Sequence, residues 1–184
     1  MNPAPLSMTS FDGRLSVEFS WDVDRFAHAL VGYDQHGTPV ASLPCVNASD
    51  DVAWPCSPPI QQLSLESLRS GDSLLAMDAL LGVGGAGTSH WSISVQWVES
   101  VDWATLKFEL ACRCRQTPES LGSQYPVDPR FVIQPGKDSI LIQENDWLRI
   151  QPTETNQTGT IRWEYSVNLD PASVADQKRF LVGR

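Results

Sequence analysis

The sequence predicts an all-β fold, an antiparallel β-sandwich of the jelly-roll-like or Ig-like kind with about eight or nine strands. Three observations support this prediction. Several short segments alternate apolar and polar residues, as strands with one buried face do. Residues that favour turns separate these segments. The alternation also argues against a parallel sheet, because such a sheet is covered on both faces and its strands are apolar throughout.

Residues 90–97 and 105–115 show the alternation most clearly. Their apolar side chains fall on one face, namely Trp91, Ile93, Val95 and Trp97 in the first segment and Leu106, Phe108, Leu110, Cys112 and Cys114 in the second. The opposite face of the first segment carries His90, Ser92, Ser94 and Gln96. Residues 98–104 connect the two segments. We therefore expect an antiparallel hairpin.

The same criterion assigns the rest of the chain. We expect residues 1–12 to form a flexible arm, 13–170 a single β-sandwich domain and 171–184 a C-terminal tail. The other expected strands are 14–24, 26–33, 60–68, 74–81, 131–133, 139–143, 147–151 and 160–169. Short apolar patterns leave a helical alternative open for 26–33, 60–68 and 74–81.

Residues 34–59 are expected to form a long loop. The segment contains five prolines, and proline cannot donate a hydrogen bond to a sheet ladder. Residues 40–43 can pair briefly within it. Irregular segments of this length often carry a binding surface, so this loop is the first candidate for one. The structural alternative is a proline-stiffened cover over a sheet edge.

Gly82, Gly84 and Gly87 match the spacing GxGxxG of a dinucleotide-binding turn. That motif functions where a strand ends and a helix begins, because the helix amides hold the pyrophosphate. Here the glycines lead into the strand pattern at residue 90. We therefore expect no cofactor and interpret residues 82–89 as a glycine-rich turn.

The composition argues against several classes of partner. The formal net charge is −9, whereas nucleic-acid and anionic-membrane binding depends on clustered lysine and arginine. No apolar run approaches the roughly 20 residues that span a bilayer. The first ten residues lack the basic region and the apolar core of a signal peptide, which favours a cytoplasmic location.

The four cysteines do not follow the spacing of a zinc site. Cys112 and Cys114 lie on the apolar face of a predicted strand, where cysteine acts as a small hydrophobic residue. Cys45 and Cys56 flank the proline-rich loop and can form a disulfide in an oxidising compartment. With no His-x-His or HExxH motif in the sequence, we expect no metal site.

The candidate ligand-binding residues are Trp54, His90, Ser92 and Trp103. Trp54 and Trp103 lie in predicted loops, where an aromatic ring can form a platform for a sugar or a peptide. His90 follows the glycines and points away from the apolar face, so it is also the candidate catalytic residue. Its structural alternative is a surface histidine bonded to a loop carbonyl. The small polar side chain of Ser92 leaves room for a ligand.

Three hypotheses for function follow. The first is a non-enzymatic β-sandwich module that binds a ligand or a protein partner through the loops at 34–59 and 82–89. The second is a small enzyme whose polar site combines His90 and Ser92 with Asp34 or His36. The third is a structural subunit that self-associates through an exposed strand edge, forming a homo-oligomer.

Overall fold

The computed structural model describes residues 2–46, 53–69, 76–99 and 104–170, and it confirms the predicted antiparallel β-sandwich. The described residues form thirteen strands, more than the eight or nine expected, and no helix. The strands are Leu6–Thr9 (β1), Leu15–Asp22 (β2), Arg25–Tyr33 (β3), Pro39–Pro44 (β4), Ile60–Arg69 (β5), Ala76–Ala86 (β6), Ser89–Glu99 (β7), Ala104–Cys114 (β8), Ser123–Pro126 (β9), Phe131–Pro135 (β10), Ser139–Glu144 (β11), Trp147–Pro152 (β12) and Gly159–Leu169 (β13). Within these ranges no helix is long and apolar enough to cross a membrane.

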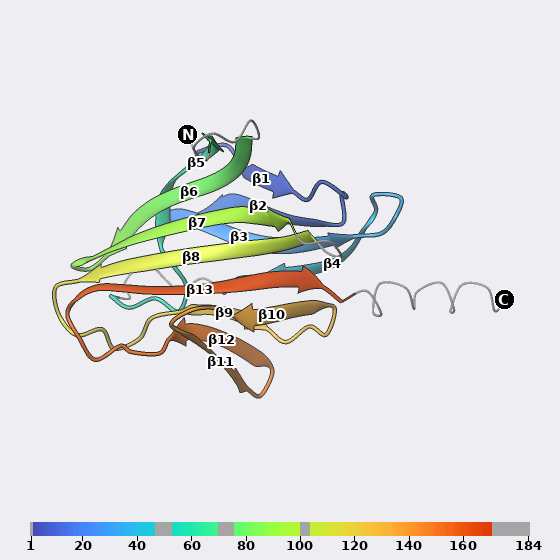
Figure 1. Ribbon diagram of the computed structural model, residues 1–184. Helices are drawn as coiled ribbons and strands as arrows, with labels where there is room; N and C mark the ends of the chain where they lie inside the picture. The colour runs from blue at the N-terminus through green and yellow to red at the C-terminus, as the bar shows by residue number, and fades with distance from the viewer. Residues whose placement is uncertain (1, 47–52, 70–75, 100–103, 171–184) are drawn as a thin grey trace.

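Ten strands belong to one sheet in the order β1-β2-β3-β5-β6-β7-β8-β13-β10, with β4 paired to β3. β3 and β5 meet at a single residue pair, Phe26 with Ile60, and the sheet turns there. As a result β2 and β3 lie behind β7 and β8 as a second layer (Figure 1). A small sheet, β11-β12-β9, lies below the sandwich in this view.

Aromatic side chains of β7, β8 and β13 pack in the core. Phe108 stacks on Tyr165 with ring centroids 4.7 Å apart, and Trp91 meets Trp163 edge-to-face at 5.9 Å. All four lie on the inward faces predicted from the alternation, and all are buried. Burying these large aromatic surfaces supplies much of the driving force for this fold.

A buried polar chain crosses the core. His28 on β3 lies 2.7 Å from the Tyr125 hydroxyl on β9, through Nε2, and the Tyr125 and Tyr165 hydroxyls are 2.6 Å apart. Each group is buried, so the hydrogen bonds offset the cost of removing polar atoms from water. This chain links the small sheet to both layers of the sandwich.

Two segments that were expected to be largely irregular contribute strands. Residues 6–9 pair with β2 and Met8 is buried, so this part of the expected arm belongs to the sheet. The brief pairing expected at 40–43 is confirmed as β4, which pairs with β3 inside the proline-rich segment. Both prolines at the ends of β4 are exposed, and β4 is an edge strand beside β3, where a missing N–H is tolerated. The tail expected at 171–184 lies outside the described residues.

The predicted glycine turn at 82–89 is wrong for most of its length. β6 continues through Gly82, Gly84 and Gly85, and only Gly87 and Thr88 form the turn to β7. Glycine is needed in the strand because its neighbours approach closely. A Cβ atom at Gly82 would lie 2.7 Å from Ile60 Cγ2, and one at Gly84 would collide with the Pro59 carbonyl oxygen.

We expect Gly84→Ala to lower the free energy of unfolding by about 2 kcal/mol, since an added methyl group forces the backbone of Pro59 away. The matched control is Gly85→Ala, whose Cβ would meet only the Ser89 carbonyl oxygen, at 3.1 Å. Urea unfolding of the two variants would measure the difference. Equal midpoints for both would contradict a close contact at Gly84.

The cysteines are free thiols. Cys45 donates to the Ser57 hydroxyl at 3.0 Å, and the Cys56 thiol donates to the Val46 carbonyl at 3.5 Å, so the disulfide considered from the sequence is not present. Burial raises the pKa of Cys45 to about 12, which keeps this thiol protonated and unreactive. Cys112 and Cys114 are buried among apolar side chains, as predicted.

Candidate functional site

The outer face of β5, β6, β7, β8 and β13 carries a trough with a cavity volume of about 760 Å³. This volume lies within the range of small-molecule sites, which is roughly 300–1,000 Å³. The trough lies across the strands, so its floor is built from outward side chains that neighbouring strands place opposite one another. Sheet register therefore determines its composition.

Two cross-strand rows form the floor and its margins. The first row is Gln62, Val83, Ser92, Ala111 and Arg162, and the second is Ser64, Leu81, Ser94, Glu109 and Glu164. All ten residues line the cavity. The middle positions are serine and alanine, and longer side chains stand at the margin on β8 and β13. The floor is therefore low at its centre, around Ala111.

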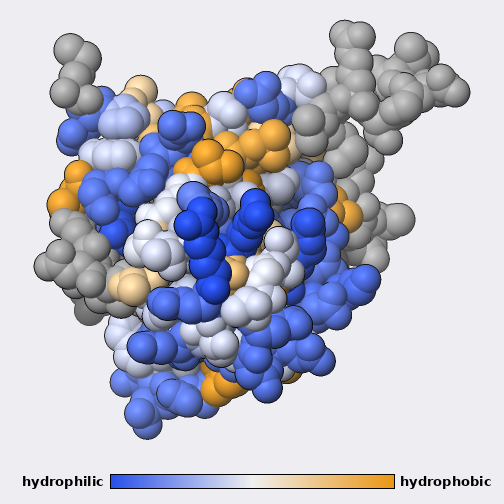
Figure 2. Space-filling model, turned by 90° about the vertical axis from the view of Figure 1, so that its left-hand side faces the viewer, coloured by the Kyte–Doolittle hydropathy of each residue, from blue (hydrophilic) through white to orange (hydrophobic). Residues whose placement is uncertain are grey.

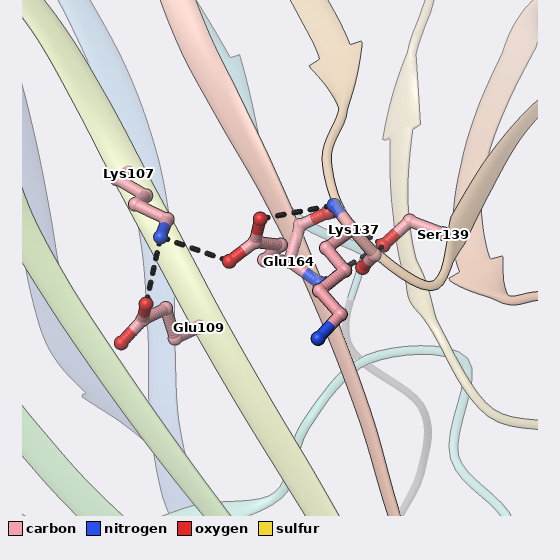
Figure 3. Close-up of polar contacts among 5 residues, drawn as sticks. All are labelled: Lys107, Glu109, Lys137, Ser139 and Glu164. Atoms are coloured by element: carbon pink, nitrogen blue, oxygen red, sulfur yellow. Dashed lines mark hydrogen bonds and ion pairs between the residues drawn. The ribbon is translucent and has the colours of Figure 1, made fainter.

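The turn between β10 and β11 forms one wall of the trough, and Glu164 holds it in place (Figure 3). The Lys137 backbone N–H donates to Glu164 Oε1 at 2.9 Å, and the Gly136 N–H donates to the Glu164 carbonyl at 2.8 Å. The Ser139 hydroxyl donates to that carbonyl and accepts from the Glu164 N–H. A Cβ atom at Gly136 would lie 2.6 Å from Glu164 Cγ, so glycine allows the turn to pack directly on the strand.

Lys107 pairs with the two carboxylates of the floor and offsets one of their two negative charges. Its Nζ lies 2.8 Å from Glu109 Oε1 and 2.8 Å from Glu164 Oε2 (Figure 3). The hydrogen bond from Lys107 lowers the pKa of Glu164, and the bonds to Glu109 and Glu164 raise the pKa of Lys107. Two carboxylates on adjacent strands invite comparison with a glycosidase, but a general acid requires a raised pKa. The pKa of Glu164 is instead lowered, which favours binding over acid catalysis.

The structure places the four sequence-predicted ligand residues in different surroundings. Ser92 lies in the floor of the trough. His90 is exposed at the start of β7, opposite Arg113 and one position beyond the rows of the floor. Trp54 is only 8% exposed and packs in the core, so its predicted role as an open platform is wrong. Trp103 lies outside the described residues.

The site of the enzyme hypothesis is not assembled. The β6–β7 turn beside His90 lies at one end of the sandwich, and the β3–β4 loop that carries Asp34 and His36 lies at the other (Figure 1). Asp34 Oδ1 instead accepts hydrogen bonds from the His36 and Thr38 backbone, which stabilises that loop. Within the ranges that the structure describes, no group of three or more histidine, cysteine, aspartate or glutamate residues converges as metal ligands do.

Sequence reasoning missed the residues that β13 and the β10–β11 turn contribute, chiefly Arg162, Glu164 and Lys137. Alternation indicated which of their side chains face outward. It carries no information on pairing between β8 and β13, which are separated by residues 115–158. The small outward side chains Ser92 and Ser94 were the only available signal.

The fold and the trough define the class as an antiparallel β-sandwich with a candidate binding face on one sheet. Comparison with known proteins adds no family: no family model, no curated protein and no solved structure matches the chain.

Proposed function

We propose that this protein is a non-enzymatic β-sandwich module that binds a polar ligand in the trough. The observation that supports the proposal is the cavity itself, which is floored by serine and alanine with Leu81 and Val83 beside them and is bordered by charged side chains. A plain solvated sheet face carries no turn packed along one side of it. Here the β10–β11 turn is fixed against β13 by several hydrogen bonds, which preorganises one side of the site.

The proposal moves the site from the loops to a sheet face. Trp54 is buried and most of the expected glycine turn belongs to β6, so these two parts of the loop surface contribute little to binding. Ser92 is the predicted residue that the new location retains, with Ser94 beside it. Their hydroxyl groups can donate and accept hydrogen bonds, which suits a ligand with hydroxyl or amide groups. Self-association through a strand edge stays a prediction.

Filling the trough should abolish ligand binding without unfolding the protein. Ala111→Tyr places a ring at the centre of the floor, and aromatic residues favour strands, so we expect its melting temperature to stay within a few degrees of the wild type. A thermal-shift screen of hexoses, amino acids, dicarboxylates and sugar phosphates provides the test. A ligand at a hundred times its Kd adds about 2.7 kcal/mol to the free energy of unfolding.

The matched control is Ala27→Tyr, which makes the same change on β3 in the other layer. We expect wild type and this control to share the same hits and Ala111→Tyr to lose them. Hits that stabilise all three proteins equally would place binding elsewhere. An empty screen for the wild type would count against a small-molecule site and in favour of a protein partner.

A further inference from the structure

Three basic side chains gather at one end of the trough: Arg162 lines it, and Arg113 and His90 lie one outward position beyond it. Arg113 on β8 lies opposite His90 on β7, and Arg162 on β13 lies opposite Ala111 on β8. Arg113 and Arg162 are therefore diagonal neighbours on the same face, and such positions lie roughly 7–8 Å apart, within reach of long side chains. Both arginines and His90 are exposed. Figure 2, which views the end of the sandwich with the β6–β7 turn, shows strongly hydrophilic side chains side by side near its centre.

These arginines differ from the neighbouring lysine in their partners. Lys107, on the same face of β8, is held between Glu109 and Glu164. Among the residues that the structure describes, neither Arg113 nor Arg162 has an ion-pair partner. The two glutamates are occupied by Lys107, and Asp138, which also lines the trough, forms no ion pair with Arg162. Both guanidinium groups are therefore available to a ligand.

We infer that the ligand of the trough carries an oxoanion, and that Arg113 and Arg162 bind it above Ala111. A carboxylate, a sulfate and a phosphate share this chemistry. A guanidinium group presents a planar fork of donors that matches two oxygens of such a group. The small side chain of Ala111 leaves room between the arginines, and the hydroxyl of Ser92, diagonal to Arg113, can donate a further hydrogen bond.

Contacts at the cationic end of the trough explain how an acidic protein can hold an anion there. The formal net charge of −9 repels anions at long range, so binding must depend on direct short-range contacts. His90, opposite Arg113, adds a third donor at this end of the trough. The charge of Lys107 is used within the protein by Glu109 and Glu164, whereas Arg113 and Arg162 form no ion pair among the described residues and can meet a ligand.

The inference rests on the proposed function, and its test uses four ligands that share one ring. Glucose is neutral, whereas glucuronate, glucose 6-sulfate and glucose 6-phosphate carry a carboxylate, a sulfate and a phosphate. Titration calorimetry on the full chain at low salt should give affinities at least about tenfold higher for one or more anions than for glucose. The ranking of the three anions identifies the source of the oxoanion. Equal affinity for glucose and all three anions would overturn the inference.

Arg113→Gln and Arg162→Gln should each weaken binding of the preferred anion by about tenfold or more, with unchanged unfolding midpoints. Arg113→Lys keeps the charge and loses the fork, so we expect an intermediate affinity. The matched control Arg14→Gln removes the same charge beside the β3–β4 loop, where Arg14 donates to the Tyr33 carbonyl. If the control lost as much affinity as the trough variants, the effect would come from net charge alone, and the inference would be overturned.

Failure of this inference is distinguishable from failure of the proposed function. A neutral ligand that Ala111→Tyr excludes, and that both arginine variants bind as tightly as the wild type does, keeps the trough as a binding site and removes the oxoanion. Anions that bind Ala111→Tyr as well as the wild type contradict both. Anions that bind the wild type, fail to bind Ala111→Tyr and bind the arginine variants weakly support both.

Discussion

Acidification from pH 7 to pH 4 should remove about 3 kcal/mol of folding stability through His28 alone. Burial lowers the pKa of His28 from 6.5 to about 4. The ring packs against Phe19, Phe108 and Tyr125, and its Nε2 bonds to the Tyr125 hydroxyl, so no carboxylate faces it among the contacts of the described chain. A charged imidazole has no counter-ion there.

The sign follows from the two pKa values. Between pH 6.5 and pH 4 the unfolded chain binds a proton at this histidine and the folded protein does not. The stabilisation is therefore fully present above pH 6.5 and is lost as the pH falls toward 4. Urea unfolding at half-unit steps from pH 7.5 to pH 4 would measure the loss.

Two variants test whether His28 causes the loss of stability on acidification. His28→Phe removes the titrating ring, and we expect the remaining stability to change little between pH 6.5 and pH 4.5, even if the variant is less stable throughout. His36→Gln, in the exposed β3–β4 loop, should retain the full pH dependence of the wild type. A His28→Phe protein that loses as much stability on acidification as the wild type would rule out His28 as the cause.

Phe108→Ala should lower the free energy of unfolding by about 3–5 kcal/mol, the range observed for large-to-small changes at buried aromatic positions. Phe108 is fully buried, stacks on Tyr165 in an almost parallel arrangement and lies 5.6 Å from the His28 ring. Its removal leaves a cavity where both layers and the polar chain meet. A loss of this size is a large part of the total stability of a typical domain.

The control for this change is Phe11→Ala, because Phe11 is 79% exposed and its ring has little surface to lose from the core. We expect less than about 0.5 kcal/mol for it. Chemical denaturation of both variants gives the comparison. A Phe108→Ala protein as stable as Phe11→Ala would show that the core collapses to fill the space, contrary to the packing described above.

Alternation was sufficient to predict the strands with one wet face. Residues 91–97 and 106–114 have the inward residues that the pattern indicated, because a period of two fixes the face of every side chain. The glycine segment was misassigned for a physical reason. Local preference treats glycine as a turn former, whereas Gly82 and Gly84 are in β6 because Ile60 and Pro59 approach them from β5 and the residue before it.

The candidate site could be predicted only in part. Ser92 was accessible to sequence reasoning because it lies on the outward face of a clear strand. Trp54 was misjudged because a position in a proline-rich segment indicates a loop and does not report burial. Arg113 and Arg162 become neighbours only through the register of β8 with β13, a long-range pairing that no local pattern encodes.

The order of pairing in the large sheet also has a consequence for folding. β5, β6 and β7 each pair with the next strand along the chain, so these contacts form at low cost in loop-closure entropy. The pairing of β13 with β8 must instead enclose residues 115–158 and the small sheet within them. We expect the four-strand meander to form early and the β8–β13 junction to form late. The trough crosses that junction, so Arg162 in its lining and Arg113 at its end would come together only in the last stage of folding.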